Sequence, residues 1–204
     1  MVIIMVHGHH LIISAYGFWL PNDPRGSWSD FVRAWELAKF GEATKVETRR
    51  SVAAAPHDRR LRAAAKEALK YPAVEFTGLQ ALSVGSGFAR YVQRSGVVVW
   101  ACSILPDHVH LVVARHRYKA ETMMQQFKGN GTMQLNRDMR HPLAGYAQPG
   151  ESAPSPWGER GWKVFLDSER DIWRAIRYVE NNPLKEGKPR QCWSFVTPFR
   201  GLRR

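Results

Sequence analysis

Cysteine is nearly absent from this chain of 204 residues, which contains only Cys102 and Cys192. Two cysteines cannot form a disulfide framework, so we expect a hydrophobic core to hold the fold and a reducing, cytoplasmic setting. Long apolar runs are absent too. The apolar start, Met1 to Val6, is far too short to span a membrane and lacks the basic beginning of a signal peptide, so no membrane partner is expected.

Acidic residues are also scarce. The chain has 18 Asp and Glu against 30 Lys and Arg, which gives a net charge of +12 and a pI of about 10.2. Such an excess of positive charge predicts a polyanionic partner such as nucleic acid. Residues 45–70 hold eight Lys or Arg against three acidic residues, and residues 184–204 hold six against Glu186. A solvated helix face is the alternative interpretation of the first segment.

The length fits a single domain, residues 1–204, with a basic insertion at about 18–76 and a basic C-terminal tail at about 184–204. No internal repeat is present. Apolar periodicity and turn residues predict strands at 9–16, 97–104, 108–115 and 162–166. The same signals predict helices at 30–40, 58–69, 77–94, 120–139 and 168–181. Pro183 is expected to stop the last of these, because proline disfavours helical geometry in the residue before it.

Two of the predicted helices are long enough to assign an inner face. For helix 77–94, with Thr77 as the N-cap, the predicted inner residues are Leu79, Leu82, Phe88, Tyr91 and Val92. For helix 120–139 they are Met123, Met124, Phe127, Met133 and Leu135, although Gly129 and Gly131 weaken the helical prediction at its middle.

The most informative stretch is the predicted hairpin around Pro106-Asp107, where Asp107 is most simply a turn residue. Because side chains alternate along a strand, His108 and His110 lie on one face and Val109, Leu111 and Val113 on the other. Two imidazoles on one rigid face can bind one divalent cation. The alternative is a pair of structural histidines that are satisfied by their neighbours.

A second informative stretch lies in the last predicted helix. Tyr178 and Asn182 are four residues apart, so their side chains share one face. If that face opposes His108 and His110, the amide oxygen can serve as a third ligand for Mg²⁺ or Mn²⁺. A tyrosine phenol is a usable nucleophile when a cation stabilises its phenolate. Spacing alone does not establish this geometry, since a helical tyrosine is usually a core or surface residue.

Both stretches resemble motifs of one known family. The stretch Ile104 to Val113, with the sequence ILPDHVHLVV, resembles the HUH (His-hydrophobic-His) motif of the IS200-like, single-tyrosine (Y1) transposases. The stretch Arg177 to Gly187, with the sequence RYVENNPLKEG, is similar to the Tyr-Ile-x-x-Asn-Pro-Val-Lys-x-Gly end of the REP-associated tyrosine transposase branch. The two motifs occur in the family's order, with a tryptophan-rich segment, Trp157 to Trp162, before the tyrosine helix. The resemblance covers residues 97–187.

The resemblance implies a fold and a chemistry. The fold would be α+β, with a ferredoxin- or RRM-like antiparallel sheet flanked by helices, the HUH motif on a central strand and the tyrosine on a C-terminal helix. His108, His110 and Asn182 would bind Mg²⁺ or Mn²⁺, and Tyr178 would attack the scissile phosphate, forming a 5′-phosphotyrosine and freeing a 3′-hydroxyl. The segment 18–76 departs from the pattern, because it is longer than a compact member needs.

The substrate implied by the resemblance is single-stranded DNA, presented as a hairpin or palindrome to a monomer or homodimer. Basic residues of the loops and helices are candidates for contacts with its phosphates: Arg25, Arg49, Arg50, Arg59, Arg60, Lys128, Arg174 and Arg177. His9 and His10 are weaker candidates for metal binding. Two alternative functions remain open, a DNA-binding protein of this fold without cleavage activity and a metal-dependent nuclease that uses water, with Tyr178 structural.

Overall fold

A four-stranded antiparallel sheet organises the chain, as seen in a computed structural model that describes residues 5–20, 37, 39–41 and 58–202. Its strands are β1 (Gly8–Ala15), β2 (Val99–Ile104), β3 (His108–Ala114) and β4 (Trp157–Leu166). The helices are α2 (Arg59–Glu67), α3 (Gly78–Ser95), α4 (Ala120–Arg137) and α5 (Glu169–Lys185), with a 3-10 turn at Ala144–Tyr146. Within these described ranges, no helix is long and apolar enough to cross a membrane.

The strand order in the sheet is β2-β3-β1-β4, and each neighbouring pair is antiparallel. Combined with the chain order β1-α3-β2-β3-α4-β4, this is the ferredoxin-like arrangement. β3 is an interior strand, paired with β2 on one side and with β1 on the other. The predicted α+β fold class is confirmed, and the first three predicted strands are confirmed to within two residues at their ends.

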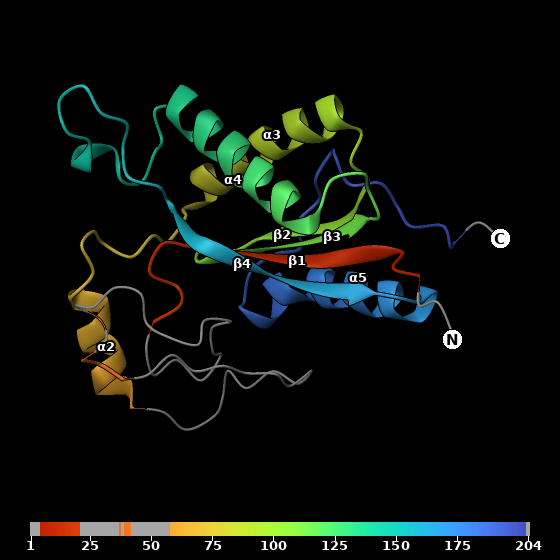
Figure 1. Ribbon diagram of the computed structural model, residues 1–204, viewed down its shortest axis with the longest axis horizontal. Helices are drawn as coiled ribbons and strands as arrows, with labels where there is room; N and C mark the ends of the chain where they lie inside the picture. Colours follow the sequence, from red (N-terminus) through yellow and green to blue (C-terminus); the bar gives the residue numbers. More distant parts are fainter. Residues whose placement is uncertain (1–4, 21–36, 38, 42–57, 203–204) are drawn as a thin grey trace.

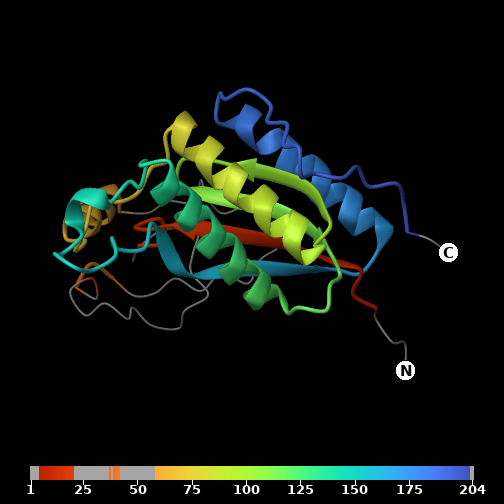
Figure 2. The ribbon, with the colours of Figure 1, turned by 90° about the horizontal axis from the view of Figure 1, so that it is seen from above.

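Helices cover both faces of the sheet. α3 and α4 lie on one face and α5 on the other (Figure 1), and the view from above shows α3 and α4 side by side across the sheet (Figure 2). The larger core, which includes Leu11, Phe88 and Phe127, lies beneath α3 and α4. A smaller core, which includes Val112 and Ile172, lies between the sheet and α5.

The side chains of β3 alternate as predicted. Val109, Leu111 and Val113 belong to the core beneath α3 and α4, whereas Val112 belongs to the core beneath α5. His108 and His110 are an even number of residues from Val112, so they share its face of the sheet. The two histidines therefore face α5.

Local capping by side chains explains where α2, α3 and α5 begin. Thr77 and Gln80 form a capping box at the start of α3, and Gly96 ends this helix with a φ of 72°. Asp58 accepts backbone hydrogen bonds at the start of α2, and Ser168 does so at the start of α5. These starts match the prediction to within a residue. The predicted helix at 30–40 lies largely outside the described residues.

The predicted inner faces of α3 and α4 were wrong at three positions. Leu79, Leu82 and Met133 are 58%, 55% and 58% exposed, respectively. The buried stripe of α3 instead runs through Gly85, Gly87, Phe88 and Tyr91. Small residues let neighbouring segments approach closely, so the stripe that contains glycines faces the core and the leucine stripe faces solvent.

β4 begins five residues earlier than predicted, at Trp157 rather than Trp162. Two glycines lie in this added part of the strand, Gly158 and Gly161, and the strand needs them because its neighbours approach closely. An added Cβ would lie 2.6 Å from the Ser14 hydroxyl at Gly158 and 2.7 Å from the Ile12 carbonyl at Gly161.

Pro183 does not stop α5, which continues to Lys185. A proline removes a single N–H donor, and here it does so in the last turn of the helix. The carbonyl of Pro183 accepts a hydrogen bond from the backbone N–H of Lys188 at 2.9 Å. Gly187, with a φ of 67°, turns the chain away from the helix.

The close crossing of α3 and α4 can be tested with Gly87→Ala. An added Cβ would lie 2.3 Å from the backbone oxygen of Asn130, so we expect overpacking to lower the free energy of unfolding by about 1–3 kcal/mol in urea denaturation. Gly129→Ala is the control, because this exposed glycine in α4 has open space around its Cβ position. It should raise the stability by roughly 0.5–1 kcal/mol. An unchanged or raised stability in Gly87→Ala would contradict the crossing.

Candidate functional site

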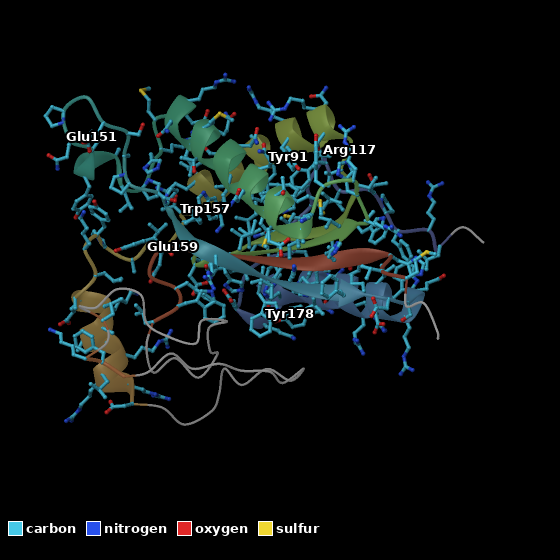
Figure 3. All side chains as sticks on the ribbon, viewed as in Figure 1. Tyr91, Arg117, Glu151, Trp157, Glu159 and Tyr178 are labelled. Atoms are coloured by element: carbon cyan, nitrogen blue, oxygen red, sulfur yellow. The ribbon has the colours of Figure 1, made fainter. Side chains whose placement is uncertain are left out.

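Four of the predicted site residues meet between the sheet and α5. His108 and His110 come from β3, while Tyr178 and Asn182 come from α5, one turn apart. The Asn182 amide nitrogen lies 3.5 Å from Nε2 of His108, at the long end of the hydrogen-bond range. The rings of His110 and Tyr178 are 5.4 Å apart and nearly perpendicular. Tyr178 lies on the α5 side of the sheet (Figure 3).

The site has a buried polar floor and an exposed tyrosine. His108, His110 and Asn182 are all buried, whereas Tyr178 keeps 39% of its surface exposed. Buried polar side chains are retained only where they have partners or a chemical role. Tyr178 is therefore the most accessible of the four side chains.

Asp107 orients the ring of His108. Its carboxylate lies 2.7 Å from Nδ1 of His108 and accepts the Nδ1–H of a neutral ring. The lone pair of such a ring is then on Nε2, which faces the side-chain amide of Asn182. Amide nitrogen and oxygen exchange places by rotation of the amide, so Asn182 can present an oxygen here. Histidine metal ligands usually have a carboxylate or carbonyl partner of this kind.

His10, from β1, plays the corresponding part for His110. Its Nε2 lies 3.0 Å from Nδ1 of His110, and both side chains are buried. If the Nδ1–H of His110 donates to His10, the lone pair of His110 is on Nε2. Both candidate ligand rings can therefore hold the same tautomer, with Nε2 available to a cation.

Burial keeps two of these histidines neutral. It lowers the pKa of His10 to about 4, with the nearby His108 as a second cause. It also holds the pKa of His110 well below its ordinary value, with His108 and His10 adding to the effect. Neutral imidazole is the form that binds metal ions, so the candidate ligand His110 carries the required charge state at neutral pH, and its partner His10 is neutral as well.

Tyr178 is a protonated phenol in these surroundings. Partial burial raises its pKa above the ordinary value, and the carboxylate of Glu186 raises it further. The ammonium of Lys185 lies 4.8 Å from the centre of the tyrosine ring. A nucleophilic role for the phenol therefore requires a positive charge near its oxygen in the reacting complex.

The donor chemistry fits a divalent cation. Among the residues that the structure describes, no group of three or more His, Cys, Asp or Glu is arranged to hold a metal ion. The predicted set of His108, His110 and Asn182 contains only two residues of those types, with an amide as its third member. Two neutral imidazoles and an amide oxygen are donors that Mn²⁺ and similar ions accept.

The predicted DNA contacts that lie within the described residues are spread over three helices, α2, α4 and α5. Arg174 and Arg177 are exposed on α5, where Arg174 pairs with Asp171 at 2.6 Å. Lys128 is on α4, across the sheet, and its ammonium donates to the carbonyls of Gly158, Glu159 and Arg160. Arg59 and Arg60 are exposed on α2. Arg25, Arg49 and Arg50 lie outside the described residues, and DNA contact by all eight stays a prediction.

Sequence reasoning missed the orienting partners. Asp107 was interpreted as a turn residue, although its position directly before His108 offered a signal. His10 shares a strand face with Ile12, which pairs with His110 across β1 and β3, but the register of these strands cannot be read from the sequence. The ring of Phe18 lies 5.0 Å from that of His108, and nothing in the sequence indicated that Phe18 would lie beside the site.

Comparison with known proteins finds structural likeness at low identity. No protein-family model matches the chain, and no curated protein matches it. Its structure is similar to that of a REP-associated tyrosine transposase bound to a REP hairpin, with 12% identity and a TM-score of 0.47 over 100% of this chain and 96% of the other. It is also similar to a proposed transposase from Deinococcus radiodurans, with 14% identity and a TM-score of 0.40 over 89% of this chain and 94% of the other.

The lowered histidine pKa values predict acid sensitivity of the metal-free protein. Between about pH 6.5 and pH 4 the unfolded chain protonates His10 while the folded chain does not, so the free energy of unfolding should fall as the pH falls. At about 1.36 kcal/mol per pKa unit, His10 contributes roughly 3 kcal/mol of this loss. Urea denaturation across this range should show a smaller loss in His10→Leu. Equal losses in the two proteins would contradict a buried, neutral His10.

Proposed function

We propose that this protein cleaves and rejoins single-stranded DNA through a covalent bond between Tyr178 and a 5′-phosphate. The observation that carries the proposal is the convergence of Tyr178 and Asn182 on the two histidines of β3, with the rings of Tyr178 and His110 5.4 Å apart. The ordered pair of motifs in the sequence supports it independently. The basic character of the chain suits a polyanionic substrate.

In this proposal His108, His110 and Asn182 hold the cation, Mg²⁺ or Mn²⁺, through two Nε2 atoms and the amide oxygen. When bound, the cation supplies Lewis-acid polarisation of the scissile phosphate and favours the phenolate form of the tyrosine. Asp107 and His10 act as positioning residues, because each accepts the Nδ1–H of one ligand ring. Burial of the histidines keeps water from competing for these hydrogen bonds.

The proposed cleavage is a transesterification that consumes no water. The Oη of Tyr178 forms a bond to phosphorus while the bond from phosphorus to the 3′-oxygen breaks. The 5′-phosphate stays on the tyrosine, and the phenol proton ends on the released 3′-oxygen in the overall balance. Attack by the same or another 3′-hydroxyl reverses the step and releases the tyrosine. Because the phosphodiester energy is retained, the enzyme can join strands as well as cut them.

A covalent adduct with Tyr178 tests the proposal. The protein is incubated with Mn²⁺ and a single-stranded hairpin DNA labelled at its 3′ end, then analysed on a denaturing gel. The fragment downstream of the cut should stay attached to the protein, whereas DNA labelled at its 5′ end should give a free fragment with a 3′-hydroxyl. Tyr178→Phe should abolish the adduct, because it removes the attacking oxygen.

Tyr146→Phe is the matched control, since Tyr146 is exposed to a similar extent, 44% against 39% for Tyr178, and lies outside the site. Adduct formation should be unchanged in this variant. Cleavage that survives Tyr178→Phe would indicate a water-using nuclease instead. DNA binding without adduct or cleavage in the unchanged protein would indicate a binding protein, and either result would contradict the proposal.

The positioning roles predict weaker metal binding in His10→Leu. Loss of the acceptor for His110 Nδ1–H should lower the affinity for Mn²⁺ by about 10–100-fold, the usual effect of removing a partner of a ligand. Titration calorimetry and ring-nitrogen NMR report the affinity and the His110 tautomer. His9→Leu is the control, because His9 neighbours His10 on β1 but faces the other side of the sheet. If His10→Leu and the unchanged protein bind Mn²⁺ with equal affinity, His10 does not act as a positioning residue.

A further inference from the structure

A basic patch lies at the end of β3 away from the two candidate ligands. It surrounds an open pocket of about 750 Å³, lined at the end of α3 by Ser95 and just after β3 by Arg115, His116 and Arg117. From its first residue to its last, β3 extends for about 20 Å, at roughly 3.3 Å per residue. Figure 3 shows Arg117 on the side of the sheet that carries α3 and α4, and Tyr178 on the other side. The basic patch is therefore separate from the candidate site.

The cations of the basic patch are exposed and unpaired. Arg115 and Arg117 are exposed, and neither forms an ion pair within the part of the chain that the structure describes. Arg94, beside Ser95 on α3, donates to the side-chain oxygen of Asn130 at 3.2 Å, which is a neutral partner. The positive charge of these three guanidinium groups is therefore not compensated by a carboxylate.

Acidic residues are kept away from the basic patch. Between positions 94 and 119 the sequence contains one acidic residue, Asp107, which lies in the turn at the other end of β3. The next one along the chain, Glu121, is already paired with Lys163. Cations gathered in this way repel one another unless an anion binds between them. A polyanionic ligand would relieve this repulsion.

Contacts within the loop after β3 hold the basic side chains in place. The guanidinium of Arg117 lies 5.0 Å from the centre of the Tyr118 ring and donates to its hydroxyl at 3.3 Å. The backbone N–H of Tyr118 donates to Nδ1 of His116 at 3.2 Å, so Nε2 of a neutral His116 ring carries the hydrogen and is a donor. The backbone N–H of Arg115 donates to the carbonyl of His7 at 2.8 Å. The loop is therefore preformed, which lowers the entropic cost of binding.

The ring of Tyr118 is already in contact with two side chains of the loop. Arg117 lies against it, and the ring of His116 is 4.8 Å away at an angle of 58°. Binding of single strands combines cations with aromatic rings that stack on bases, whereas a duplex keeps its bases stacked inside and presents closely spaced phosphates. The basic patch offers charge and N–H donors rather than a stacking surface, which favours a duplex.

We propose that the basic patch binds the phosphate backbone of double-stranded DNA. The guanidinium groups of Arg115 and Arg117 contact phosphates, and Nε2–H of His116 donates to a phosphate oxygen. Such contacts position a duplex without reading its sequence. The inference rests on the proposed function only in taking this duplex as part of the DNA that the protein cleaves. It gives the protein a second DNA contact, on the face of the sheet opposite Tyr178.

The test compares Arg115→Ala with Arg137→Ala. Both arginines are exposed and unpaired within the described ranges, but only Arg115 lines the pocket, while Arg137 is at the far end of α4. Both substitutions are made in Tyr178→Phe and assayed without metal, so that binding is measured apart from chemistry. Fluorescence anisotropy follows a short linear duplex and an oligothymidine of the same length over a range of salt concentrations.

Arg115→Ala should weaken duplex binding several-fold and reduce the slope of log K against log salt by about 0.9, the value for one phosphate of a duplex. Arg137→Ala should change both quantities less, and the two variants should bind oligothymidine alike. Equal effects of the two substitutions on the duplex would mean that general charge holds the DNA, and would overturn the inference. A larger effect of Arg115→Ala on oligothymidine than on the duplex would indicate a single-strand site and would also overturn it.

Arg115→Lys separates a phosphate contact from a structural role. Lysine keeps the positive charge, so this variant should retain most of the duplex affinity and the full salt slope. If Arg115→Lys loses as much affinity as Arg115→Ala, the arginine supports the loop rather than binding phosphate, and the inference is wrong.

The outcomes separate this inference from the proposed function. A difference between Arg115→Ala and Arg137→Ala on the duplex, together with a missing tyrosine adduct in the unchanged protein, would uphold the basic patch and reject the cleavage mechanism. An adduct that depends on Tyr178, with no difference between the two arginine variants, would uphold cleavage and reject the basic patch.

Discussion

The packing of α5 on the face of the sheet opposite α3 and α4 is the contact on which the candidate site depends. Ile172, Ile176 and Val179 form the buried stripe of this helix and cover Val112 of β3. Each buried aliphatic side chain of this size contributes roughly 1.5–3 kcal/mol. Tyr178 and Asn182 lie beside this stripe, so the burial that fixes the helix also sets their distance from the histidines. Burial beneath α5 lowers the pKa of His110, and burial also lowers the pKa of its partner His10, so both of these rings are neutral at neutral pH.

The floor of the site is a short series of polar contacts in an otherwise apolar layer. Asp107 contacts His108, whose other nitrogen faces Asn182, and His10 contacts His110. A buried polar group without a partner is costly, so these contacts offset the loss of hydration. They also couple the tautomers: the carboxylate of Asp107 accepts the Nδ1–H of His108, and His110 donates its Nδ1–H when Nε2 of His10 is the acceptor. The contacts that make the histidines tolerable in the interior also favour a lone pair on Nε2 of each ring, which is what the proposed cation requires.

Prediction from the sequence was accurate where a local pattern decides the structure and failed where two patterns compete. The Thr77 cap of α3 and the start of α5 at about residue 168 were found, because the groups that satisfy the first backbone N–H atoms are close in sequence. Leu79 and Leu82 were placed inside, because the sequence of α3 holds two apolar stripes and packing against α4 decides between them. Pro183 was interpreted as the end of the last helix from its usual preference, yet α5 continues to Lys185.

The sequence by itself determined the alternation that puts His108 and His110 on one face and the helical spacing that puts Tyr178 and Asn182 on another. Both follow from backbone geometry within a few residues. Only the tertiary structure decided that these two faces meet, that His10, a hundred residues from His110, becomes its partner, and that Ser95 and Arg115 line one pocket. Such contacts depend on strand register and on the docking of elements far apart in the chain. The free energies that decide them are spread over the whole core, so no single stretch of sequence carries them.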